Sequence, residues 1–252
     1  METALIGYKK DIYATYVTGF KAAPLTFDVI QARRWGASYR SFLAGWMPEF
    51  KDANILDLGC GDGKLLYFFK ERGYHNLTGV DISPEQVVVA RQVIENIKEQ
   101  EAIGFLEQHR EEYDFITALD LVEHYEKEEV LRFLNACHNA LKPGGRLVLQ
   151  IPNGESPWCS AILYGDFTHE MAFQPRLLGK LLVKSGFGDI DPREAGPIVR
   201  DLLSLIRFLT WKCIKGLLMV WNLAEAGSKG SGIYTRIFFI SGKKMSPEEI
   251  QK

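Results

Sequence analysis

Short apolar runs alternate with stretches of helical periodicity between residues 53 and 151. The apolar runs predict buried strands over residues 55–58, 77–80, 113–120 and 147–151. Apolar residues at helical spacing predict helices over residues 64–72, 85–97 and 128–141. Because strands that alternate with helices pair in parallel through right-handed crossovers, the pattern predicts an α/β protein built on a parallel sheet.

The segments on either side of this region carry less regular patterns. Residues 27–47 have apolar and aromatic side chains at helical spacing up to Pro48, which predicts a helix. Residues 1–23 show no clear period, and we expect them to fold over a substrate cleft. Residues 153–173 are too rich in glycine, proline and aromatic residues for a helix, so we expect a long loop with a functional role.

The remaining elements complete one domain with a helical addition. We expect a helix over residues 175–184, a strand ending at Glu194, a helix over residues 201–223 and a last strand over residues 232–241. We divide the chain into an N-terminal helical cap (1–50), a Rossmann-like half (51–155), a substrate-side part of the same domain (156–244) and a tail (245–252).

The composition is that of an ordinary globular protein. The chain has 252 residues, of which 46% are hydrophobic and 25% charged, and a formal net charge of −2. Near-neutral charge argues against a dedicated nucleic-acid binder, so we expect no nucleic-acid partner. The four cysteines are widely spaced, and the first five residues carry neither a basic start nor an apolar signal core. We therefore expect a cytoplasmic protein.

The strongest chemical signal is a glycine-rich turn that follows the first predicted strand. Asp57 lies in the strand, and Gly59, Gly61 and Gly63 come after it at alternate positions. Neither the phosphate loop nor the dinucleotide fingerprint has this spacing, and an acid before the turn suits a cationic ligand better than a pyrophosphate. Asp81 ends the second strand, where an acid can accept hydrogen bonds from ribose hydroxyls.

The run from Asp57 to Gly63 resembles the first motif of class I S-adenosylmethionine-dependent methyltransferases, and the Leu-Lys-Pro-Gly-Gly-Arg-Leu turn at 141–147 resembles the same family. The resemblance implies a Rossmann-like, doubly wound, mostly parallel seven-stranded sheet with an antiparallel last strand, plus an N-terminal helix and a C-terminal helical insertion. It implies S-adenosyl-L-methionine as cofactor. The residues expected to bind it are Asp57, Gly59, Cys60, Gly61, Gly63, Asp81, Ile82, Glu101, Ala102, Asp120 and Leu121.

A hydroxyl acceptor would also require a base, and histidine is the usual choice near neutral pH. Of the five histidines, His124 follows the fourth strand and His169 lies in the long loop, so both should border the crevice. Asp166 and Glu170 could orient His169 as a base. In an alternative interpretation, Asp166 only caps a turn and His169 only fixes the loop.

The segment 122–125 has a counterpart in the family. Some quinone-pathway and sugar methyltransferases carry a Glu-His pair at this place, which serves as a base or as divalent-metal ligands. In this chain Asp120, Glu123 and His124 lie close together in sequence, but a complete ligand set is not visible. We therefore predict no metal ligands.

The acceptor is predicted from a less specific resemblance. The loop at 164–175, together with residues 184–187 and 193–197, resembles methyltransferases of bacterial surface-polysaccharide (O-antigen-type) pathways. This resemblance implies O-methylation of a sugar hydroxyl on a glycan or on its nucleotide- or lipid-linked precursor. The alternatives are a small phenol, a quinone precursor or another small metabolite as the acceptor, and a non-catalytic partner protein that only binds the cofactor.

The predicted helix over residues 201–223 is unusual for such a protein. It would be about 33 Å long, but Arg207, Lys212 and Lys215 interrupt its apolar sequence and oppose a transmembrane path. Its apolar face either packs within the fold, pairs with a second copy, or lies in a membrane interface. The last option would make the protein peripheral to the inner face of the membrane.

Overall fold

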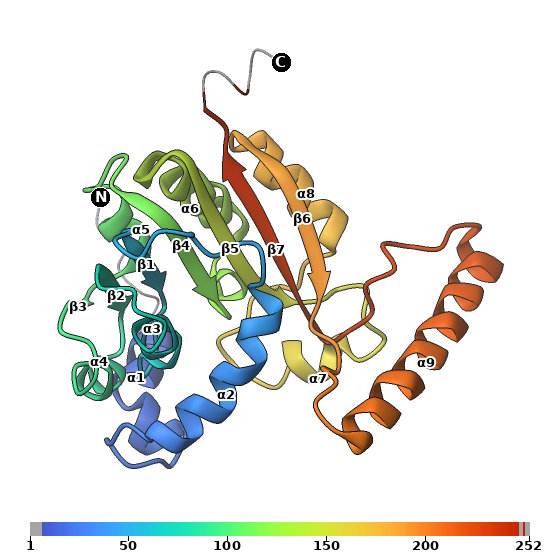
Figure 1. The fold of residues 1–252 in the computed structure, drawn as a ribbon, viewed down its shortest axis with the longest axis horizontal. Coiled ribbons are helices and arrows are strands. Elements are labelled where there is room, and N and C mark those ends of the chain that lie inside the picture. Colours follow the sequence, from blue (N-terminus) through green and yellow to red (C-terminus); the bar gives the residue numbers. More distant parts are fainter. Residues whose placement is uncertain (1–6, 247–248, 250–252) are drawn as a thin grey trace.

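The computed structural model describes residues 7–246 and residue 249. Its centre is a seven-stranded sheet in the order β3-β2-β1-β4-β5-β7-β6 (Figure 1). The strands are β1 (Ile55–Leu58), β2 (Leu77–Asp81), β3 (Ile97–Glu99), β4 (Tyr113–Leu119), β5 (Leu141–Pro152), β6 (Phe187–Glu194) and β7 (Ile237–Lys244). Strands β1 to β5 pair in parallel, and β7 is antiparallel to both β5 and β6. The predicted sheet, including its antiparallel last strand, is confirmed.

Helices cover both faces of the sheet (Figure 1). They are α1 (Gly7–Ala14), α2 (Val29–Phe42), α3 (Lys64–Lys70), α4 (Pro84–Ala90), α5 (Ala102–Leu106), α6 (Lys127–Ala140), α7 (Cys159–Leu163), α8 (Pro175–Lys184) and α9 (Leu202–Ala226), with two short helices of other types, η1 (Tyr16–Phe20) and η2 (Val122–His124). Phe69 of α3 and Val87 of α4 belong to the core on one face. Phe133 of α6 and Leu178 of α8 belong to the core on the other.

The predicted helix over residues 85–97 is wrong in its second half. Helix α4 ends at Ala90, and the chain turns so that Ile97 can pair with Gly79 of β2 as the start of β3. Burial of Ile94 and Ile97 comes from this turn and strand rather than from a continued helix. Residues 102–106 form helix α5, with Glu101 as its N-cap.

Three further segments differ from the sequence-based expectations. Residues 1–23 include α1 and η1, and the loop over residues 153–173 contains the short helix α7. The last strand begins at Ile237 rather than at residue 232. The buried Asn153 side chain donates to the carbonyls of Ile233 and Thr235 at 2.8 and 2.9 Å, so these carbonyls are not available to a neighbouring strand.

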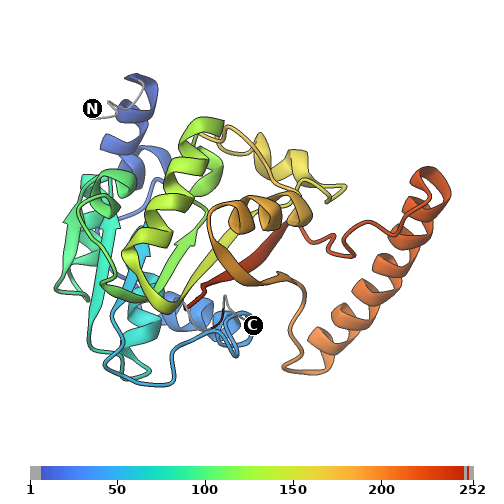
Figure 2. The same ribbon diagram turned by 90° about the horizontal axis from the view of Figure 1, so that it is seen from above.

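Helix α9 stands apart from the body of the protein (Figure 2). It confirms the helix predicted over residues 201–223 and extends it to Ala226. Asp201 and Ser204 form a capping box at its start, and Gly227, with a φ of 66°, ends it. Within residues 7–246, no helix is both long enough and apolar enough to cross a bilayer. The expectations for the first five residues and for most of the tail at 245–252 fall outside the described residues.

Candidate active site

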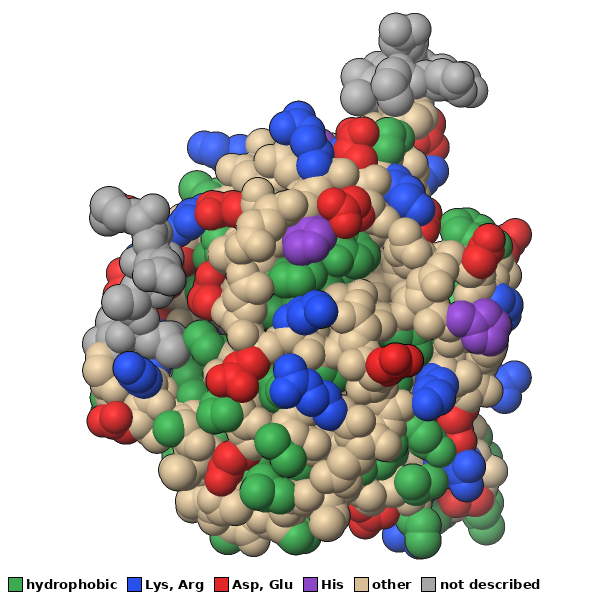
Figure 3. All heavy atoms as spheres, turned by 90° about the vertical axis from the view of Figure 1, so that its left-hand side faces the viewer, with side chains coloured by type: hydrophobic (Ala, Val, Ile, Leu, Met, Phe, Trp, Pro, Cys, Tyr) green, Lys and Arg blue, Asp and Glu red, His purple; other side chains and the backbone are tan. Residues whose placement is uncertain are grey.

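The carboxyl ends of β1, β2 and β4 border a cavity of about 370 Å³. This is the position where ligands bind in open parallel sheets. Ten of the eleven predicted cofactor-binding residues line the cavity: Asp57, Gly59, Cys60, Gly61, Asp81, Ile82, Glu101, Ala102, Asp120 and Leu121. Gly63 is the exception. Over the described residues of the face shown in Figure 3, acidic and basic side chains are interspersed and form no continuous basic stripe.

The turn after β1 requires glycine because of its backbone conformation and its close packing. Gly59, Gly61 and Gly63 have φ values of 63°, 54° and 84°, in the left-handed region that side chains disfavour. A Cβ at Gly63 would lie 3.1 Å from the Cβ of Ala90. Gly63 therefore shapes the turn against α4, while Gly59 and Gly61 line the cavity with main chain.

Asp81 is fixed in place at the end of β2. Its two carboxylate oxygens accept hydrogen bonds from the backbone N–H groups of Gly61 and Ser83, each at 2.8 Å. Desolvation raises the pKa of Asp81 despite these bonds. Each oxygen keeps a second lone pair, so the carboxylate can accept two further donors from the cavity.

Asp57 is the more deeply buried carboxyl group, with 3% of its surface exposed. Its Oδ1 accepts a hydrogen bond of 2.6 Å from the hydroxyl of Thr117. Burial raises the pKa of Asp57 to about 7. A cation bound in the cavity would favour the ionised form of this group.

Two lining residues are held by contacts that the sequence did not reveal. Glu101 accepts hydrogen bonds from the N–H groups of Ile103 and Gly104, so the same residue caps α5 and borders the cavity. Asp120 has a φ of 51°, and its carboxylate accepts a 2.7 Å bond from the amide of Gln150.

Aromatic residues from the N-terminal part of the chain close the cavity. The ring of Trp35 lines it and stacks on Tyr39 at 3.7 Å, and the hydroxyl of Tyr39 donates to Gln150. Tyr13 and Tyr16, in the segment without a sequence period, line it as well. No local signal distinguished these residues, because only the tertiary fold brings them to the strand ends.

His124 is the one predicted catalytic residue that lines the cavity. Its Nδ1 lies 2.9 Å from the hydroxyl oxygen of Thr168, and that hydroxyl donates to Asp166 at 2.6 Å. Because the only hydroxyl hydrogen of Thr168 points to the carboxylate, Nδ1 of His124 must carry the hydrogen, which leaves Nε2 as an acceptor. Burial, followed by the effect of His169, lowers the pKa of His124 to about 4, so the ring is neutral at pH 7.

The expected pairing of His169 with Asp166 is wrong. Asp166 accepts hydrogen bonds from Thr168, and Glu170 forms an ion pair with Lys9 at 2.7 Å. His169 instead places Nδ1 3.1 Å from the carbonyl oxygen of Ile162 and does not line the cavity. Asp166 is thus linked to His124 through the hydroxyl of Thr168 and forms no side-chain hydrogen bond with His169 in the described structure.

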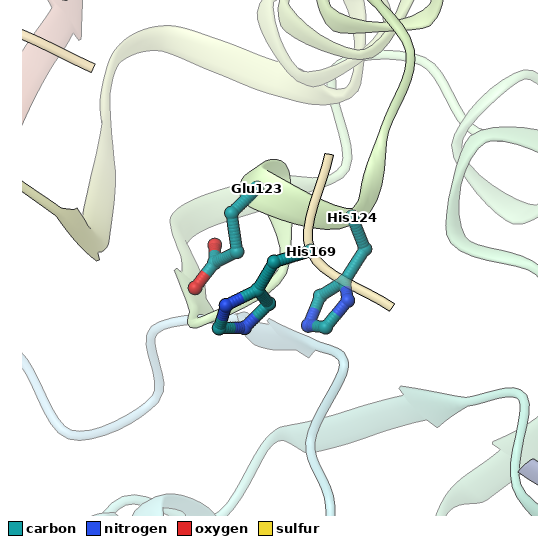
Figure 4. Close-up of side chains that lie close together, drawn as sticks. All are labelled: Glu123, His124 and His169. Atoms are coloured by element: carbon teal, nitrogen blue, oxygen red, sulfur yellow. The ribbon is translucent and has the colours of Figure 1, made fainter. Parts of the chain in front are cut away.

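Glu123 is a further candidate functional residue, and it lies beside both histidines (Figure 4). One possible ligand atom each from Glu123, His124 and His169 lies within 4.8 Å of the others. Both carboxylate oxygens of Glu123 are buried without a hydrogen-bond partner, and burial raises its pKa well above the usual range. The carboxyl group is therefore either protonated or partnered by a cation, and this donor set suits a divalent transition metal.

The geometry agrees with the comparisons with known proteins. A family model described as a methyltransferase domain matches residues 29–190. The chain belongs to this methyltransferase family. A ubiquinone biosynthesis O-methyltransferase of Pseudomonas aeruginosa is 28% identical over 172 residues, which cover 64% of this chain and 72% of the relative. The corresponding protein of Pseudomonas paraeruginosa is 33% identical with the same coverage.

Solved structures agree on the fold. A SAM-dependent methyltransferase from Archaeoglobus fulgidus has a TM-score of 0.63 at 22% identity, covering 84% of this chain and 94% of its own. The Burkholderia thailandensis 1,6-didemethyltoxoflavin-N1-methyltransferase, with S-adenosylhomocysteine bound, has a TM-score of 0.56 at 16% identity, covering 98% and 94%. The protein is an S-adenosylmethionine-dependent methyltransferase. The resemblance to surface-polysaccharide enzymes is not shown by these comparisons.

We expect donor binding by this methyltransferase to tighten with pH through the titration of Asp57. The folded pKa of about 7 means that the carboxyl is largely protonated below this pH. A cationic donor favours the ionised form, so its dissociation constant should fall up to about tenfold per unit as pH rises to 7, and then level off. Calorimetry from about pH 5.5 to about pH 8 measures this slope. The Asp57→Asn variant should lose this dependence of donor affinity on pH. An equal slope in that variant would show that another group titrates on donor binding.

Proposed function

We propose that this methyltransferase transfers the methyl group of S-adenosylmethionine to a hydroxyl of a small phenol or quinol, with His124 as the base. The observation that carries the proposal is His124 itself. Its unprotonated Nε2 is available at the cavity bordered by the predicted donor-binding residues. An acceptor hydroxyl needs such a proton acceptor, whereas a tertiary or neutral amine acceptor does not.

The cofactor supplies a methyl group already activated by its cationic sulfur. The remaining task of the protein is to align the acceptor and exclude water. Asp81 and Glu101 line the cavity and would hold the donor, and Trp35 lines it as well. His124 would take the hydroxyl proton at Nε2 as the acceptor oxygen bonds the methyl carbon and the carbon–sulfur bond of the donor breaks, while Nδ1 stays hydrogen-bonded to Thr168.

One part of the cavity lining is aromatic and cationic. Tyr16 stacks on Phe20 with 5.5 Å between ring centroids, and the ammonium of Lys21 lies 4.7 Å above the Tyr16 ring. Both Tyr16 and Lys21 line the cavity. A planar phenol can stack on such a ring, and a nearby cation stabilises negative charge on its oxygen or on a carboxylate substituent.

Names of the relatives favour this acceptor class over a sugar. The matching proteins of two Pseudomonas species are ubiquinone biosynthesis O-methyltransferases. These relatives are 28% and 33% identical to this chain, and we infer its acceptor class from their names. The expected glycan or sugar precursor has no comparable support.

A methyl-transfer assay with labelled donor tests the proposal. The acceptor panel contains catechols and dihydroxybenzoates, nucleotide sugars, and small amines. We expect turnover with a catechol-type acceptor and none with the amines. Turnover confined to nucleotide sugars would overturn the phenol assignment and retain O-methylation, and turnover confined to amines would overturn both.

We expect Thr168→Val to lower kcat by about tenfold with little change in donor affinity. The side chain is fully buried, and valine has the same shape but removes the hydroxyl acceptor at 2.9 Å, so Nδ1 of His124 keeps only its longer contacts of 3.2 Å to the Thr168 carbonyl oxygen and 3.3 Å to the Tyr13 hydroxyl among the described residues. Loss of one hydrogen bond that fixes the ring is worth about 1–1.5 kcal/mol, or roughly tenfold in rate. Steady-state kinetics measure the effect, and Thr168→Ser should restore the rate. Equal losses in the serine and valine variants would point to packing instead.

A further inference from the structure

Helix α9 lies between β6 and β7, outside the residues matched by the methyltransferase family model. It touches the body through one face only. Lys215 forms an ion pair of 3.1 Å with Glu194, Asn222 bonds the hydroxyl of Tyr234 at 3.0 Å, and the Trp211 ring lies near Trp158. None of the helix residues is buried.

The opposite face is apolar along the whole helix. At about 100° per residue, an arc of about 160° contains no charged side chain of α9. Seven large side chains on this arc are 52% to 74% exposed: Leu202, Leu203, Ile206, Leu209, Leu217, Val220 and Trp221. A continuous exposed apolar surface of this kind marks an interaction site.

The width of this face favours a bilayer over a second copy of the chain. A two-helix contact buries a narrower seam and is held in register by charged or polar side chains beside it. Here such a seam would leave Leu203 and Trp221 on one flank and Leu205 and Leu223 on the other exposed to water. A lipid surface covers the full arc and requires no register.

Charges next to the arc suit anionic headgroups. Arg207 lies on one side of the helix, and Arg200 and Lys229 flank its ends, all three exposed, whereas Lys212 on the other side forms an ion pair of 3.2 Å with Glu194. Over residues 200–229, basic side chains outnumber acidic ones. The indole N–H of exposed Trp221 donates to Glu225 at 2.8 Å, so the ring presents an apolar edge with its polar group satisfied.

We propose that α9 lies flat in the interface of an anionic lipid bilayer, with its apolar arc among the acyl chains and its cations toward the headgroups. Docking would bring an adjoining groove lined by Trp158, Ile162 and Trp211 near the membrane surface. The carbonyl oxygen of Ile162 is also the partner of His169, whose ring lies 4.8 Å from that of His124 between centroids. The proposal is independent of which acceptor the methyltransferase uses.

Co-sedimentation with vesicles of phosphatidylcholine, with and without phosphatidylglycerol, tests the docking. We expect binding to the anionic vesicles at low salt that weakens at physiological salt. The double variant Leu217→Ser/Trp221→Ser should bind at least about tenfold more weakly, because it removes two large apolar groups from the contact. Its melting temperature and donor affinity should match those of the unmodified protein, since both sites are exposed.

A matched control replaces exposed apolar residues elsewhere. Ile30 on α2 and Val88 on α4 are 66% and 50% exposed, and Ile30→Ser/Val88→Ser should leave vesicle binding unchanged. Equal weakening by both double variants, or a protein that stays in the supernatant at low salt, would overturn the proposal. Analytical sedimentation without lipid tests whether a second copy of the chain binds this face instead. A dimer that is dissociated by Leu217→Ser/Trp221→Ser but not by the control variant would assign the face to a second copy.

Discussion

Replacing Asp81 by alanine should raise the dissociation constant for S-adenosylmethionine by at least about a hundredfold. We expect the two free lone pairs of its carboxylate to accept the ribose hydroxyls, and each charge-assisted bond is worth about 1.5–3 kcal/mol. The variant also removes the acceptors of the Gly61 and Ser83 N–H groups, which shape the turn beside the donor. Isothermal calorimetry measures the affinity.

Glu99 offers a matched control for this substitution. It pairs with Asp81 across β2 and β3 but is exposed and does not line the cavity. Glu99→Ala should bind the donor as the unmodified protein does. The donor affinity of Asp81→Asn should lie between those of Asp81→Ala and Glu99→Ala, because the amide keeps one acceptor oxygen. If the Asp81→Ala protein folds and binds the donor with unchanged affinity, the donor does not bind at the end of β2.

His124→Ala should lower turnover by at least about a hundredfold, which is the usual contribution of a positioned base. The dissociation constant of S-adenosylmethionine should change little, because the proposal places His124 on the acceptor side. Single-turnover measurements at saturating donor separate the chemical step from binding. Unchanged single-turnover rates would show that another group removes the proton.

A control variant and a chelation experiment show whether His124 acts as a base or as a metal ligand. His75 is exposed and far along the chain from the loop at 164–175, so His75→Ala should retain full activity. Chelation of divalent metals should leave the unmodified enzyme active if His124 acts as a base alone. Loss of activity on chelation, with recovery on adding Mn²⁺, would instead assign Glu123, His124 and His169 to a metal.

The sequence alone predicted most of the residues at the strand ends that line the cavity. The glycines of the turn and the acids at the ends of β1 and β2 are fixed by local requirements, since the turn needs positive φ and strand ends follow from apolar runs. The parallel sheet follows from the same alternation of elements. The boundary of α4 could not be found this way, because Ile94 and Ile97 keep helical spacing although the chain bends to pair β3 with β2.

Only the tertiary structure decided how the acceptor side is arranged. Sequence placed both His124 and His169 near the crevice, but the hydrogen bonds of Thr168 direct Asp166 to His124 and leave His169 bonded to a carbonyl. The sequence likewise showed that α9 is amphipathic, but not that its apolar face is exposed. Both depend on contacts between segments far apart in the chain, and local periodicity contains no information about such contacts.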